Sequence, residues 1–138
     1  MTTDTFFGSL HLLSSMNEDE NRSGVVRGLK NAEIQAQKKL PMVVDNFTIL
    51  TKVSFIDNDT PRMEYVYKVG FTLQNIKDDM GFNVWANKRE KELIKMLCDR
   101  KLAYKINVEF AYKYIGRNEI FIGEFVIKTS DCSMRNRR

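Results

Sequence analysis

The chain has 138 residues, of which 43% are apolar, and its formal net charge is +4. A chain of this size and composition can fold as one domain that buries its core without a metal or several disulfides. No run of 18 apolar residues occurs, so the sequence predicts no membrane-spanning segment.

Residues 1–23 combine an apolar patch with an acidic stretch at 17–21 and show little periodicity. We expect this segment to be loose, or ordered only by a partner or a second copy of the chain. Its large apolar side chains either fold back on their own domain or bury against a neighbour. Because the strands already account for a full core, we predict a dimer formed through Phe6, Phe7, Leu10, Leu12 and Leu13.

The same patch is a poor targeting signal. Gly8, Ser9 and His11 interrupt it, and Asp4 precedes it where a secretory signal carries positive charge. The sequence itself therefore predicts a cytoplasmic protein.

A single α+β domain is expected over residues 24–132, and it begins with a helix at 24–40. Ser23 is the expected N-cap and Pro41 the stop. Apolar residues recur every three or four positions in this helix, at Val25, Leu29, Ala32, Ala36 and Leu40. In the stretch that follows, we expect Met42 to fill the core and Asp45 to accept hydrogen bonds that fix a turn.

Strands are expected at 47–56 and 62–73, because apolar and polar residues alternate there. The segment 57–61 between them is dense in turn-forming residues, which predicts a hairpin. A second helix is expected at 82–99, with Asp78 and Asp79 near its N-terminus. Its predicted buried stripe is Phe82, Trp85, Ala86, Leu93, Met96 and Leu97, while residues 88–92, including Arg89, are expected to face solvent.

A second hairpin is expected from strands at 101–114 and 119–128, joined at 116–118. Tyrosines on the predicted strands could form a platform that stacks nucleic-acid bases. Each one is in phase with aliphatic or aromatic neighbours, so core packing is the preferred interpretation for Tyr65, Tyr67, Tyr104, Tyr112 and Tyr114. Burial is likewise preferred over ligand binding for Trp85.

The positive charge is concentrated at the C-terminus, where residues 101–138 hold 8 basic and 4 acidic side chains. The tail at 133–138 contains Arg135, Arg137 and Arg138, and we interpret it as a solvated end. A nucleic-acid partner is therefore not expected.

Recognisable catalytic and binding motifs are missing from the sequence. The lone histidine, His11, lies in the N-terminal segment, and one histidine with two distant cysteines gives no zinc-ligand spacing. No glycine-rich phosphate loop or nucleophile turn occurs. We therefore assign no catalytic, cofactor-binding or metal residues.

Cys98 and Cys132 are the only cysteines. A cysteine near the end of a helix and another just past the last strand come within disulfide reach if the helix packs on the sheet. A bond between them would stabilise the fold by roughly 3 kcal/mol. In a reducing cytoplasm the same residues would be buried thiols.

The chain also resembles a family of uncharacterised small bacterial proteins over about residues 30–132. The resemblance rests on several short stretches: 40–45 (Leu-Pro-Met-Val-Val-Asp), Thr48, Leu50, Val53, 65–67, Cys98, 110–114, 122–125 and 131–132 (Asp-Cys). It implies an exported α+β domain with paired cysteines and no assigned activity. Such proteins often come from integron gene cassettes, and the element order is similar to that of type II secretion pilotins.

The expected fold is α+β, an antiparallel sheet of two hairpins, about four strands, with two helices on one face. The expected function is a non-catalytic binding or assembly module that self-associates or docks a protein partner through the N-terminal segment or a strand edge. The alternative is a small-molecule enzyme with a cleft between helix and sheet, in which Asp45 or a tyrosine acts as acid or base.

Overall fold

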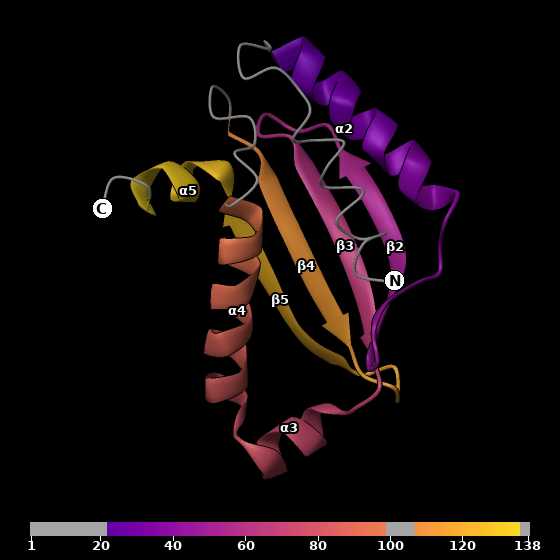
Figure 1. The fold of residues 1–138 in the computed structure, drawn as a ribbon, viewed down its shortest axis with the longest axis vertical. Helices are drawn as coiled ribbons and strands as arrows, with labels where there is room; N and C mark the ends of the chain where they lie inside the picture. Colours follow the sequence, from indigo (N-terminus) through magenta and orange to yellow (C-terminus); the bar gives the residue numbers. More distant parts are fainter. Residues whose placement is uncertain (1–21, 99–106, 136–138) are drawn as a thin grey trace.

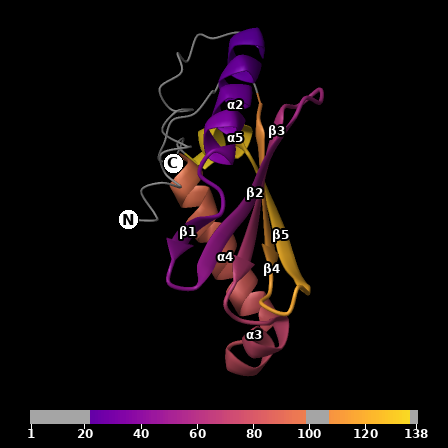
Figure 2. The ribbon, with the colours of Figure 1, turned by 90° about the vertical axis from the view of Figure 1, so that its right-hand side faces the viewer.

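The computed structural model describes residues 22–98 and 107–135, with the side chains of residues 133–135 excepted. The fold is α+β, a single sheet with helices gathered on one face (Figure 1). Seen along the sheet, α2 and α4 lie on the same side, and no described helix covers the opposite, open face (Figure 2). The predicted class and the one-sided helix layer are therefore present. None of the described helices is long and apolar enough to cross a membrane.

The sheet has five strands in the order β1-β2-β3-β4-β5. They are β1 (Met42–Asp45), β2 (Thr48–Ile56), β3 (Arg62–Val69), β4 (Glu109–Ile115) and β5 (Phe121–Lys128). Both predicted hairpins, β2–β3 and β4–β5, are present and antiparallel.

Two features of the sheet correct the prediction of four antiparallel strands. The additional strand β1 pairs with the first half of β2, and β3 and β4 run parallel, with Tyr65 opposite Tyr112. The reason is the connection between the hairpins, because a chain that leaves β3 through helices and returns beside it can enter the sheet in the same direction. The sheet is mixed.

Helix α2 (Arg22–Gln37) begins before the predicted N-cap, so Ser23 lies inside the helix, and it ends before Leu40. The Leu40–Pro41 peptide bond is cis. Val25, Leu29, Ala32 and Ala36 are buried, as their spacing predicted. The helix therefore packs its apolar stripe against β2.

Two side chains of α2 satisfy backbone groups along the part of β2 that β1 does not reach. The Phe55 N–H donates to the Glu33 carboxylate at 2.7 Å, and the Gln37 side-chain amide donates to the Val53 carbonyl at 2.5 Å. An unpaired strand edge invites pairing with another chain. The helix therefore closes this edge of the sheet with side chains.

We expect Glu33→Ala to lower the free energy of unfolding by about 1.5 kcal/mol, because the Phe55 N–H loses a charged acceptor in a partly buried position. Urea denaturation followed by circular dichroism measures this loss. Glu90→Ala, at an exposed position of the second long helix, is the matched control and should stay within about 0.5 kcal/mol of the parent. Equal stability of both variants would contradict the edge-closing role of Glu33.

The segment after α2 behaves as predicted. Met42 is buried in the core, and the Asp45 carboxylate accepts the Phe47 N–H at 2.8 Å. The Gly70 N–H donates to the Phe47 carbonyl at 2.7 Å, which joins the β1–β2 turn to the end of β3.

Helix α3 (Leu73–Asp79) occupies a segment where the sequence predicted the end of a strand. Thr72 is its N-cap in a capping box with Asn75, at 3.1 and 3.0 Å. The helix ends where the N–H groups of Met80 and Gly81 both donate to the Ile76 carbonyl, and Gly81 has a φ of 86° that favours glycine. Asp78 therefore lies at the end of α3, which corrects its predicted role at the start of the next helix.

Helix α4 (Phe82–Cys98) has the predicted bounds to within one residue. Of its predicted buried stripe, Leu93 and Leu97 are buried, whereas Phe82, Trp85, Ala86 and Met96 are only partly buried. Within the described residues, the strand predicted at 101–114 is β4, from Glu109 to Ile115, and residues 101–106 lie outside the described part. Helix α5 (Thr129–Arg135) includes part of the predicted basic tail. At its start, the Thr129 hydroxyl accepts the Val108 N–H and the Asp131 carboxylate accepts the Lys128 N–H. Cys98 of α4 and Cys132 of α5 form a disulfide with Cα atoms 5.1 Å apart.

The core is built around a row of tyrosines on β3 and β4, as predicted. Tyr65 and Tyr112 stack with ring centroids 5.3 Å apart, and Tyr67 and Tyr114 stack at 5.1 Å. All four rings are almost completely buried. They lie on the covered face of the sheet, where they cannot act as an exposed stacking platform. Tyr104 lies outside the described residues.

Candidate functional site

A cleft of about 390 Å³ opens on the covered side of the sheet between α4 and the β1–β2 turn. Its walls come from segments far apart in the sequence. One wall is the β1–β2 turn with the ends of β3 and β4, and the other is α4. The lining residues are Asp45, Asn46, Phe47, Thr48, Val69, Phe71, Trp85, Arg89 and Tyr114.

Arg89 is the cationic residue in this lining. Its Nε donates to the Tyr114 hydroxyl at 2.9 Å, and its guanidinium lies 5.2 Å from the centre of the Tyr114 ring. A longer contact of 3.4 Å joins its Nη1 to the carboxylate of Glu92. Among the described residues, Nη2 has no hydrogen-bond partner. The guanidinium is thus oriented by Tyr114 while part of its donor set remains available to the cleft.

The charge state of Tyr114 is fixed by its surroundings. Burial raises the pKa of the Tyr114 hydroxyl, and the charge and hydrogen bond of Arg89 oppose that rise. At neutral pH the hydroxyl is therefore protonated, and it can accept from Arg89 while it donates elsewhere. A protonated phenol cannot act as a general base.

Aromatic side chains form the apolar part of the cleft. Trp85 packs edge-on against Phe71 and Tyr114, with ring centroids 6.5 and 5.7 Å apart. Phe47 lies in the β1–β2 turn and is 65% exposed, which is unusual for a phenylalanine. Phe71 and Trp85 also line a second cavity of about 320 Å³ beside α3, so they separate two hollows of the same surface.

The structure brings together the two residue types that the enzyme hypothesis invoked. Asp45 and Tyr114 both line the cleft between helix and sheet. One oxygen of Asp45 accepts the Phe47 N–H, which serves the turn as predicted. Trp85, for which burial was preferred, is only partly buried and contributes to the same lining.

The structure gives no further predicted site residue a place in the cleft within its described residues. Phe6, Phe7, Leu10, Leu12, Leu13 and His11 lie outside the described residues. The cysteine pair joins α4 to α5 and does not line the cleft. No group of three metal-ligating side chains occurs within residues 22–98 and 107–135.

Arg89 was missed, because the charged run at 88–92 was interpreted as the solvent face of the helix. Its position contained a usable signal. Arg89 follows Trp85 by four residues and precedes Leu93 by four, so the three share one face of an α-helix. An arginine between two apolar neighbours on that face is well placed to reach a cleft.

Comparisons with known proteins support the fold and identify no ligand. No protein-family model and no curated protein matches the sequence. The fold is similar to the 1.60 Å crystal structure of a proposed secreted protein from Pseudomonas aeruginosa, with a TM-score of 0.51. The likeness covers 78% of this chain and 91% of that one at 6% sequence identity. At this identity it supports the α+β fold alone.

Proposed function

We propose that this protein is a non-catalytic binding module that self-associates and takes its ligand in the cleft beside α4. The observation that carries the proposal is the placement of Arg89 in an aromatic-walled hollow with its Nη2 group unengaged by the described residues. Apolar clefts with a few convergent polar groups are the usual form of ligand sites.

The lining favours a ligand with a carboxylate beside an apolar or aromatic group. A guanidinium pairs well with a carboxylate because the two are planar and can form parallel hydrogen bonds. Trp85, Phe71 and Phe47 offer the apolar surface for the remainder of the ligand. The contact with Glu92 is long, at 3.4 Å, and Glu92 is half exposed, so an incoming carboxylate can displace it at little cost.

The test uses the single tryptophan of the chain, which lines the cleft and reports its occupation by fluorescence. We expect phenylacetate to change Trp85 fluorescence saturably and 2-phenylethanol, which lacks the carboxylate, to bind more weakly. Arg89→Gln should weaken phenylacetate binding about tenfold or more, because a charge-assisted hydrogen-bonded pair is lost.

Lys91→Gln is the matched control, since it removes one positive charge from an exposed position of the same helix. It should leave the phenylacetate titration unchanged. An equal loss of binding in both variants would assign the effect to net charge and contradict the cleft. The absence of a saturable response to either probe would contradict the proposed ligand class.

An enzyme is the second candidate, favoured by the placement of Asp45 and Tyr114 at one cleft. The two candidates differ in what happens to a bound compound. A binding module returns the ligand unchanged after prolonged incubation, whereas an enzyme converts it, and proton NMR of the recovered compound distinguishes these results.

A further inference from the structure

The two edges of the sheet differ in how many of their backbone groups are hydrogen-bonded by other elements. At one edge, β1 and the side chains of α2 satisfy β2. At the other edge lies β5, which pairs only with β4 in the described sheet. Val126, in the middle of β5, is 40% exposed. A strand edge of this kind is a template for another strand.

The backbone direction of β5 identifies which residues face the free edge. The Thr129 N–H points inward and donates to the Val108 carbonyl at 3.0 Å. The backbone N–H and C=O groups of successive residues in a strand point toward opposite edges. Those of Glu124, Val126 and Lys128 therefore point away from β4, toward the free edge. The Lys128 N–H already donates to the Asp131 carboxylate at 3.1 Å, so the outward N–H groups that remain for a neighbouring strand are those of Glu124 and Val126.

The charges on the open face favour one register for antiparallel pairing of β5 with β5 of a second copy of the chain. Antiparallel pairing about Glu124 would place two glutamates opposite each other, and pairing about Phe125 would place Glu124 opposite Val126. Pairing about Val126 places valine opposite valine and Glu124 opposite Lys128 on both sides. Directly opposed unlike charges and apolar pairs stabilise neighbouring strands, whereas like charges destabilise them.

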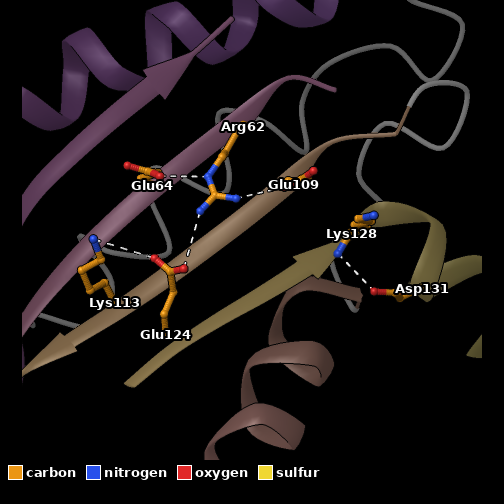
Figure 3. Close-up of polar contacts among 7 residues, drawn as sticks. All are labelled: Arg62, Glu64, Glu109, Lys113, Glu124, Lys128 and Asp131. Atoms are coloured by element: carbon orange, nitrogen blue, oxygen red, sulfur yellow. Dashed lines mark hydrogen bonds and ion pairs between the residues drawn. The ribbon is translucent and has the colours of Figure 1, made fainter. Parts of the chain in front are cut away.

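The ion pairs that Glu124 makes within its own chain are long. Arg62 is held by Glu64 at 2.8 Å and Glu109 at 3.0 Å, while Glu124 lies 3.8 Å from it (Figure 3). Glu124 is also 3.9 Å from Lys113, at the outer limit of an ion pair. The side chain of Lys128 has no ion-pair partner within the described residues. Glu124 can therefore exchange these long contacts for a closer cation.

We propose that β5 of two copies of this chain pair antiparallel, with Val126 facing Val126 of the partner subunit and Glu124 facing Lys128 of the partner subunit. The inference rests on the proposed self-association and names its surface. A closed two-fold dimer results, because the same patch is used twice and the sheets join edge to edge. The interface lies apart from the cleft, whose lining contains no residue of β5.

Sedimentation velocity of the full chain at low ionic strength tests the pairing by charge reversal. We expect the parent to reach twice the 16.1 kDa monomer mass with increasing concentration. Glu124→Lys and Lys128→Glu should each raise the dimer dissociation constant about tenfold, because each places like charges opposite one another. The double variant Glu124→Lys/Lys128→Glu should restore dimerisation, and Lys52→Glu, exposed on β2, should leave it unchanged.

A parent that stays monomeric, single variants that dimerise like the parent, or a double variant that is not rescued would each overturn the pairing. So would loss of dimer in Leu10→Asp with retention in Glu124→Lys, because the N-terminal segment would then be the interface. The phenylacetate titration of Trp85 in the same variants reports the cleft separately. Intact binding in a monomeric parent would overturn the interface while leaving the cleft standing.

Discussion

Replacing Tyr112 by alanine should lower the free energy of unfolding by about 3 to 5 kcal/mol, the largest loss we expect from a single substitution. Its ring is fully buried, and it stacks on Tyr65 at 5.3 Å and on Tyr67 at 6.3 Å. Alanine would leave a cavity on the covered face of the sheet, over the paired strands β3 and β4, where the hydrogen-bonded backbone has little freedom to collapse. Urea denaturation with linear extrapolation measures the loss.

The conservative variant separates the ring from its hydroxyl. The Tyr112 hydroxyl is buried and has no hydrogen-bond partner among the described residues, and burial raises its pKa well above the ordinary value. Tyr112→Phe should therefore be neutral or stabilise the fold by up to about 1 kcal/mol. Tyr114→Phe should instead cost about 1 kcal/mol, since it removes the acceptor of Arg89. A large loss in Tyr112→Phe would show that this hydroxyl is engaged.

Removing the disulfide should have the second largest effect. Cys98 and Cys132 are 34 positions apart, so the bond closes a loop whose entropy contributes about 3 to 4 kcal/mol in the chain-entropy model. We expect a double Cys98→Ser/Cys132→Ser variant to unfold at a correspondingly lower urea concentration than the oxidised parent.

Reduction of the parent with dithiothreitol provides the matched comparison, because it breaks the same bond without changing the side-chain volume. It should shift the midpoint in the same direction, and it should not shift the serine variant. If oxidised and reduced parent unfold at the same urea concentration, the bond contributes nothing to stability. Titration of free thiols in protein isolated from the native host then shows whether the pair is oxidised in its own compartment. We expect free thiols in a cytoplasmic protein and a disulfide in an exported one.

Much of the local structure followed from the sequence, because alternation and helical spacing depend on neighbouring residues. The buried stripe of α2 and the core positions of Tyr65 and Tyr112 were predicted from period alone. The turn function of Asp45 followed from its chemistry. Helix α3 was missed although Thr72 and Asn75 form its capping box, because the apolar alternation continued through Phe71 and Leu73.

What the sequence determined by itself was therefore the identity of the main elements and the face that each one buries. Only the tertiary structure decided how those elements meet, because pairing direction and helix position depend on contacts between residues far apart in the chain. Apolar and polar residues alternate along a strand in the same way whether its neighbour is parallel or antiparallel. The parallel pairing of β3 with β4 could therefore not be predicted from the sequence. The contribution of Arg89 to the cleft could not be predicted for the same reason. The sequence indicates the helix face on which Arg89 lies. The strands that complete the cavity come from distant segments, as does the Tyr114 hydroxyl that orients the guanidinium.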